Sequence, residues 1–188
     1  LGGGTTRYSN VETVLGSTAT DTAVMLTGGD LAVSSVETIV GSTDVDALRM
    51  LGAGTVTASR IETVLGSTAS GDNVTLLGTD ESVAVSLVDL VTGTTGTDDV
   101  VTMLSAGALS VSIVDSVLGS GGTDTVTMIG QTDIRISSVE TLVGTSEAGT
   151  SGSDVAVGEV ATFRLVVTIP TGSLADFQVQ DFLPAGYA

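Results

Sequence analysis

The chain of 188 residues has 22 acidic and five basic side chains, so its formal net charge is −17, and it contains no Cys and no His. Without these residues the chain has no disulfide, thiolate nucleophile or zinc cluster, and it lacks the usual general base. The acidic balance argues against a nucleic-acid partner and against anionic membranes, because both are bound by clusters of Lys or Arg.

Apolar residues make up 41% of the chain and aromatic residues only 3%. The mean hydropathy is +0.49. This composition predicts β structure with an aliphatic core rather than a disordered acidic tail. No segment approaches the roughly 18 consecutive apolar residues that a membrane-spanning helix needs, so we expect no membrane insertion. The chain starts at Leu1 without a basic leader region, and we therefore expect it to be part of a longer protein.

A block of the type Val-Glu-Thr-Val-Leu-Gly-Ser recurs six times and is called here the first block. Its copies start at Val11, Val36, Ile61, Val88, Val114 and Val139, at intervals of 25, 25, 27, 26 and 25 residues. A regular period of this length is typical of repeat architectures in which each repeat stacks on the next.

Two further blocks follow within each period. The second block begins with Asp and covers residues 21–26, 46–51, 72–77, 99–104 and 124–129. The third block alternates apolar and small polar residues at 31–34, 56–59, 83–86, 109–112 and 134–137. Alternation with a period of two indicates strands with one buried face, so each period is predicted to hold three short strands and no helix.

The fold class predicted for residues 1–144 is an all-β parallel β-solenoid of about five coils, with one period per coil. Hairpins are the alternative arrangement, but in-register stacking explains why equivalent positions carry equivalent residues. One buried ladder is predicted at Leu26, Leu51, Leu77, Leu104 and Ile129, with a second at Met25, Met50, Leu76, Met103 and Met128. Glycines at the corners are expected to supply backbone conformations that other residues resist.

The repeat ends after Gly144, and residues 145–153 have the small, polar composition of a linker. Residues 154–188 contain two alternating apolar segments, at 155–170 and 175–186. Part of this region resembles the start of the DUF11-type conserved repeat domain, through Gly158, Glu159, Thr162, Phe163, Leu165, Val167, Asp181, Leu183, Pro184 and Gly186. The resemblance implies an Ig-like β-sandwich of prokaryotic surface proteins, of which about 35 residues are present, so the sandwich is expected to be truncated.

Residues 1–144 resemble the β-solenoid repeats of large bacterial surface and type I secreted proteins, in which runs similar to Val139–Thr145 recur. This resemblance implies an extracellular or cell-surface location in a prokaryote. It also implies that the partners are neighbouring domains of a longer parent chain.

The second blocks begin with a row of aspartates, at Asp21, Asp46, Asp72, Asp99 and Asp124. On adjoining coils these carboxylates could present several oxygens to Ca²⁺, which prefers such ligands. The alternative, which we favour, is that each Asp caps a turn by accepting a hydrogen bond from a nearby backbone amide.

The first blocks carry a second acidic row, at Glu12, Glu37, Glu62, Asp89, Asp115 and Glu140. Members on adjoining coils would stand about 4.8 Å apart and repel one another. We therefore expect this row to face solvent; a row bridged by cations is the alternative.

No catalytic, cofactor-binding or metal-binding residue is predicted with a specific role. The repeats contain no insertion long enough to form a cleft. The chain has no His or Lys that could act as a base to activate its many hydroxyl groups. We therefore expect a non-enzymatic rod or spacer of a larger surface protein, adhesin or fibre. Two alternatives remain: a subunit that self-assembles through open strand edges, and a calcium-dependent adhesin module.

Overall fold

The computed structural model describes residues 2–95, 98–131 and 134–144, which form 17 strands in two parallel sheets. The nine strands of sheet A are, in spatial order, β1 (Gly4–Tyr8), β3 (Asp21–Met25), β5 (Thr38–Val40), β7 (Gly54–Ser59), β9 (Asp72–Leu76), β11 (Leu90–Thr92), β13 (Gly107–Ser112), β15 (Asp124–Met128) and β17 (Thr141–Val143). The eight strands of sheet B are β2 (Thr13–Leu15), β4 (Gly29–Ser34), β6 (Asp46–Met50), β8 (Thr63–Leu65), β10 (Ser82–Ser86), β12 (Val100–Met103), β14 (Ser116–Leu118) and β16 (Arg135–Ser137).

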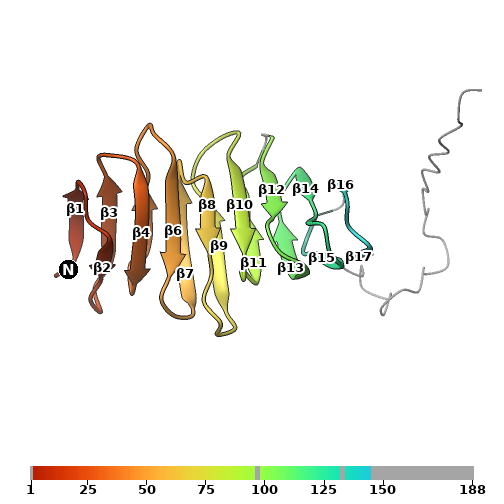
Figure 1. The fold of residues 1–188 in the computed structure, drawn as a ribbon, viewed down its shortest axis with the longest axis horizontal. Helices are drawn as coiled ribbons and strands as arrows, with labels where there is room; N and C mark the ends of the chain where they lie inside the picture. Colours follow the sequence, from red (N-terminus) through yellow and green to blue (C-terminus); the bar gives the residue numbers. More distant parts are fainter. Residues whose placement is uncertain (1, 96–97, 132–133, 145–188) are drawn as a thin grey trace, which may run out of the picture. The chain divides into compact units, whose positions relative to one another are not determined.

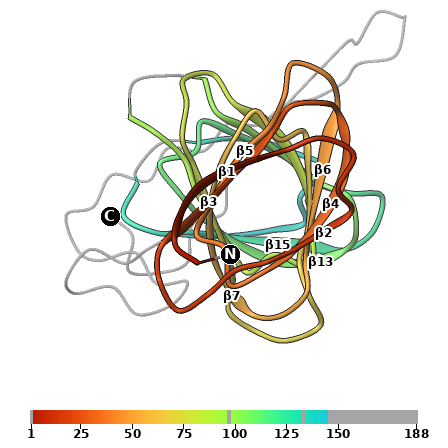
Figure 2. The ribbon, with the colours of Figure 1, turned by 90° about the vertical axis from the view of Figure 1, so that its left-hand side faces the viewer.

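The chain passes from one sheet to the other at every turn, so each coil contains two strands, and the described residues make about eight coils (Figure 1). Viewed along the stack, the coils wind around a common interior (Figure 2). The parallel β-solenoid and its three short strands per period are therefore confirmed. The prediction that each coil contains one period is wrong.

The 25-residue period spans one and a half coils. Its three strands fill a two-strand coil and half of the next, so equivalent strands alternate between the sheets: β2 lies in sheet B and β5 in sheet A. Three consecutive coils contain two periods. Because each period makes one and a half coils, the described residues form roughly eight coils rather than the predicted five.

The core lies between the two sheets and is aliphatic throughout. Second-block strands bury their first, third and fifth residues, as in β3, where Asp21, Ala23 and Met25 point inward and Thr22 and Val24 are half-buried. Along the stack the interior is filled mainly by valine, with leucine, isoleucine, methionine and alanine between. Side chains of similar volume allow equivalent strands to occupy either sheet.

Only one of the two predicted apolar ladders is buried. Met25, Met50, Leu76, Met103 and Met128 are at most 8% exposed, whereas Leu26, Leu51, Leu77, Leu104 and Ile129 are 41–56% exposed. The exposed residues directly follow the last inward residue of each second-block strand, so the pleat turns them outward at the corner. Members of both rows also alternate between the sheets, so neither forms one continuous ladder.

The predicted linker at 145–153 and the predicted Ig-like fragment at 154–188 lie outside the described residues. Among the described residues, no helix is long and apolar enough to cross a membrane.

Two adjacent leucines provide a test of this topology. Leu76 is 3% exposed and Leu77 is 54% exposed. Leu76→Ala should lower the free energy of unfolding by about 3 kcal/mol, whereas Leu77→Ala should lower it by less than about 1 kcal/mol, because little apolar area is lost from the core. Urea unfolding of both variants measures the difference, and equal losses would contradict the outward position of Leu77.

Candidate functional site: the acidic corners of the coils

Each second-block Asp closes the corner that precedes its strand. The Asp46 carboxylate is fully buried, and its Oδ2 accepts hydrogen bonds from the Ser42 amide at 2.5 Å and the Ser42 hydroxyl at 2.9 Å. Asp21, Asp72, Asp99 and Asp124 are equally buried and accept an amide hydrogen bond at 2.6 Å from Ser17, Ser67, Thr94 and Ser120, respectively. The turn-capping interpretation of this row is therefore confirmed.

The second carboxylate oxygen distinguishes the corners from one another. Oδ1 of Asp21 accepts from the Gly3 amide at 2.9 Å, and Oδ1 of Asp99 accepts from the Glu81 amide at 3.1 Å. Oδ1 of Asp46 and of Asp72 is buried without a hydrogen-bond partner. Asp124 also accepts from the Gly107 amide, at 3.2 Å. In three of the five corners the carboxylate thus joins its own turn to the preceding coil of the same sheet.

Five of the six first-block acids connect the same corners to the following coil. The Asp21 amide donates to Oε2 of Glu37 at 2.7 Å. The same contact joins the amides of Asp46, Asp72, Asp99 and Asp124 to the carboxylates of Glu62, Asp89, Asp115 and Glu140 at 2.7–3.0 Å. Most of these acids are exposed, as expected, but one oxygen of each is committed to a backbone amide.

Neither acidic row forms a ladder on adjoining coils. Asp21 and Asp72 begin β3 and β9, which are three coils apart in sheet A, while Asp46 lies in sheet B. At about 4.8 Å per coil, nearest members on one side are about 14 Å apart, beyond the screening length of about 8–10 Å at physiological salt. The predicted spacing of one coil, and the repulsion inferred from it, are therefore wrong.

The split rows also separate the carboxylates that were considered as calcium ligands. Within residues 2–95, 98–131 and 134–144, no group of three or more acidic side chains is placed to hold a metal ion. Calcium binding at the Asp row stays a prediction without a geometric basis in adjoining coils.

The corners also contain a backbone contact that the sequence pattern does not predict. Five glycines, at Gly16, Gly41, Gly66, Gly93 and Gly119, donate their amides at 2.8 Å to a carbonyl of the next coil in the same sheet. A Cβ atom on any of them would lie 1.5–2.1 Å from the following carbonyl oxygen, that of Ser35, Arg60, Leu87, Ile113 or Ser138. These five residues have φ of 54–56°, the left-handed region.

The expectation that corner glycines supply unusual backbone conformations is confirmed at Gly29, Gly71, Gly107 and Gly130, which have positive φ. It is wrong for the first-block glycines. The positive φ belongs to the residue before each first block, whereas the first-block glycine is required because the carbonyl leaves no space for a side chain. A non-glycine residue in the left-handed region costs about 1–2 kcal/mol. The five residues that face these glycines have this unfavourable conformation. In each case the carbonyl of the residue before it accepts the hydrogen bond from a first-block glycine amide.

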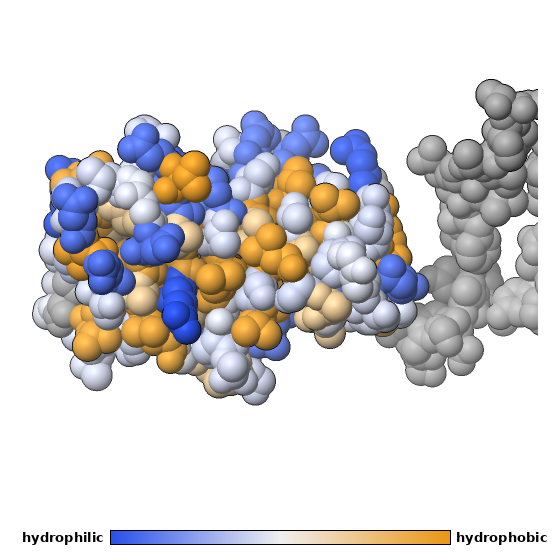
Figure 3. All heavy atoms as spheres, in the orientation of Figure 1, coloured by the Kyte–Doolittle hydropathy of each residue, from blue (hydrophilic) through white to orange (hydrophobic). Residues whose placement is uncertain are grey.

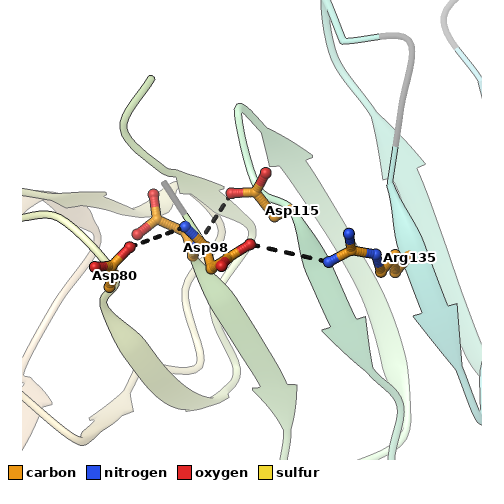
Figure 4. Close-up of polar contacts among 5 residues, drawn as sticks. Asp80, Asp98, Asp115 and Arg135 are labelled. Carbon is orange, nitrogen blue, oxygen red and sulfur yellow. Dashed lines mark hydrogen bonds and ion pairs between the residues drawn. The ribbon is translucent and has the colours of Figure 1, made fainter. Parts of the chain in front are cut away.

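Charged contacts between side chains add little to the corners. Arg135 lies 3.9 Å from Asp98, and both side chains are about 80% exposed, so the pair contributes no more than about 1 kcal/mol. Figure 4 shows this pair beside Asp80, which accepts from the Asp98 amide at 3.1 Å, and beside Asp115. The backbone amides, rather than the arginines, therefore compensate the buried acids here.

The described surface has shallow recesses rather than an enclosed cleft. Three equivalent recesses lie at corners, beside residues 10–12, 33–36 and 85–89. The face shown in Figure 3 mixes apolar and hydrophilic residues along the stack. On the outer face of sheet A, in-register hydroxyl side chains form one row: Thr5, Thr22, Thr38, Thr57, Thr75, Thr92 and Ser112.

No family model, curated protein or solved structure matches the chain.

Removal of one corner carboxylate should destabilise the fold. Asp46→Ala leaves the buried Ser42 amide and hydroxyl without their acceptor, which should cost about 2–4 kcal/mol of unfolding free energy. Asp44→Ala is the matched control, because it removes the same charge from an exposed side chain two residues away. Chemical denaturation compares the two variants. Equal stabilities would show that the Asp46 carboxylate does not hold the corner.

The corners should also make the fold sensitive to acid. The Ser17 amide, followed by the Ser17 hydroxyl and the Gly3 amide, lowers the pKa of Asp21 below its ordinary value of 3.8, against the opposing effect of burial. A lowered folded-state pKa means that the stability from Asp21 is complete above the unfolded value and is lost as the pH falls through the folded value.

The variant Asp21→Asn isolates this contribution. It should be less stable than the natural chain at neutral pH, and the difference should shrink below pH 3.8. Urea midpoints at neutral and acid pH measure the effect, with Asp44→Asn as the control for loss of an exposed charge. A difference that does not change with pH would exclude a titrating role for Asp21.

Proposed function

We propose that residues 1–144 form a non-enzymatic structural rod, a spacer that holds neighbouring domains of a longer extracellular prokaryotic protein apart. The observation that carries this proposal is the unbroken parallel ladder of both sheets through about eight coils. At about 4.8 Å per coil the rod is about 40 Å long.

The uniformity of the coils supports a mechanical role. Each period repeats the same buried carboxylate, and one aliphatic core runs along the stack. Catalytic sites depend on local departures from such regularity, in the form of loops that bring different side chains together. The recesses described above are open and lie at corners, and the carboxylates of both repeated acidic rows mostly accept hydrogen bonds from backbone amides.

The extracellular location rests on the composition and on the repeats. A cysteine-free, strongly acidic chain remains soluble through charge repulsion. Its repeats resemble those of large bacterial surface and type I secreted proteins.

A change in rod length tests the spacer function. Deletion of residues 36–87 removes two periods, or three coils, and joins Ser35 to Val88 so that each remaining strand keeps its sheet. Because the chain has no Cys, Thr27→Cys and Thr123→Cys give clean attachment sites for two spin labels. The labels lie at opposite ends of their strands, because Thr27 follows β3 and Thr123 precedes β15. The mean label distance should therefore fall by about 10 Å, less than the axial length of the three deleted coils, with a distribution as narrow as in the undeleted chain.

The width of the distance distribution is the decisive control. A broad distribution in the undeleted chain would contradict a rigid spacer, and so would a deletion that left the mean distance unchanged. Circular dichroism before labelling confirms that both proteins retain their β structure.

A further inference from the structure

Five corners of the array lead into a first-block strand and are each covered by a turn of the following coil. These corners precede β2, β5, β8, β11 and β14, and the covering turns precede β4, β7, β10, β13 and β16. One position in the covering turn stands beside the corner, and it is occupied by Gly28, Ala53, Thr79, Ala106 and Gln131 in the five turns. Only Gln131 has a long side chain at this position.

The Gln131 side chain shows which group the corner accepts. Its Nε2 donates to the Val114 carbonyl oxygen at 3.0 Å, and its Oε1 accepts from the Val114 amide at 3.0 Å. One primary carboxamide thus satisfies both backbone groups of a residue that is 2% exposed. Another of the five corners is filled by Glu81, whose Oε1 accepts from the Arg60 amide and the Ser59 hydroxyl, each at 3.3 Å.

Val36 and Val88 take the place of Val114 in two corners that are open to solvent. They are 3% and 5% exposed, and within the described residues no hydrogen bond reaches the amide or the carbonyl of either. Val36 lines a recess beside Ala53, and Val88 lines an equivalent recess beside Ala106. Buried backbone amides and carbonyls require hydrogen-bond partners, and in these two corners the partners must enter through the recess.

We propose that the recesses at Val36 and Val88 bind primary carboxamide groups, presented as Gln or Asn side chains by an extended segment of a partner polypeptide. A primary carboxamide carries one acceptor and two donors on the same carbon, which is the pairing that Gln131 supplies to Val114. This binding function is additional to the spacer role and does not rest on it.

Other common groups do not match both backbone atoms of a buried valine. A carboxylate offers acceptors only and would add a negative charge beside Glu37 in one recess or Asp89 in the other. Lys and Arg side chains offer donors only. A single trans amide, such as an N-acetyl group, directs its N–H and its C=O to opposite sides, so it reaches one of the two atoms but not both.

The spacing of the two recesses favours a polypeptide over a free small amide. Val36 precedes β5 and Val88 precedes β11, which are three coils apart in sheet A, or about 14 Å. Four residues of an extended chain span about the same length, and side chains four residues apart in a strand point to the same face. Two amide side chains at this spacing reach both recesses at once, which strengthens binding over that of one amide.

A nuclear magnetic resonance titration of the isotope-labelled full chain tests the proposal. The probe is the acetylated peptide Gln-Lys-Thr-Lys-Gln with an N-methylamide end, so that only its two Gln side chains carry primary carboxamides. Its lysines suit a chain of charge −17. The amide resonances of Val36 and Val88 should shift as peptide is added. The Val114 resonance should stay in place, because Gln131 already fills that corner.

Two further probes separate amide recognition from charge and from single amides. The matched peptide Met-Lys-Thr-Lys-Met keeps the charge and the length of the side chains, and it should shift neither resonance. Acetamide at the same concentration of amide groups should cause a smaller shift than the Gln peptide, since each molecule reaches one recess only.

Substitution of the covering residue should close each recess from within the chain. Ala53→Gln should abolish the shift of the Val36 resonance, while Val88 should require more peptide, because one amide then binds alone. Ala106→Gln should have the reverse effect. Both variants should have a higher urea midpoint than the natural chain, since the new side chain satisfies buried backbone groups.

Gln131→Ala provides the converse test. It should lower the urea midpoint and make the Val114 resonance respond to the Gln peptide. Circular dichroism confirms that each variant keeps its β structure.

Four results would overturn the proposal: no shift at Val36 and Val88, equal shifts with the Met peptide, equal shifts with acetamide, or a Val36 shift that survives Ala53→Gln. The third result would leave a site for small amides and exclude the paired polypeptide contact.

Discussion

A buried carboxylate at the corner between the first-block and second-block strands, present in five successive periods, is the interaction on which the coils depend. A chain that leaves one sheet and enters the other must turn within a few residues, and the amides of that turn point toward the interior. Apolar side chains cannot satisfy them. The Asp46 carboxylate does so with the Ser42 amide and hydroxyl, while the Asp46 amide is satisfied by Glu62 from the next coil. A buried charge is tolerated because charge-assisted hydrogen bonds replace its hydration.

A period of one and a half coils separates the equivalent acids that in-register stacking of identical coils would place side by side. Stacked identical coils place identical charges one strand apart, where they repel. Here the carboxylates of Glu37 and Asp89 are three coils apart on the same side. The acid that adjoins each of them, Asp21 or Asp72, is a buried second-block aspartate whose own carboxylate accepts hydrogen bonds from a serine of its turn. The chain can therefore repeat an acid in every period without forming a continuous charged ladder. The condition is that both sheets accept the same inward side chains, which the predominance of valine in the core allows.

Alternation and turn chemistry could be predicted from the sequence because both depend on near neighbours. The inward position of Met25 and the capping role of Asp21 follow from residues within one strand and one turn. The size of the coil could not be predicted in this way, since a period of two shows which side chains share a face but not which strand lies above. The alternation therefore predicts a buried Leu26, although the corner turns this side chain outward.

The corner contact was hidden from the sequence for a different reason. The five residues of this contact share a left-handed backbone but no side-chain property, so no compositional signal marks them; they are Ser35, Arg60, Leu87, Ile113 and Ser138. The signal lies one coil further back, in the unvarying glycine of the first block. Its cause is the close approach of another coil, which only the three-dimensional arrangement makes visible.

The parallel ladder also determines how the molecule responds to tension. The strands run across the long axis, so a pull on the two ends loads the hydrogen bonds of the outermost strand first and peels the coils one at a time. A coil of 16–21 residues, extended at about 3.4 Å per residue, releases roughly 50–70 Å of chain. It occupied only about 4.8 Å of the stack. The stack of coils is therefore highly extensible under load. Each coil that unfolds lengthens the chain before the next coil bears the force.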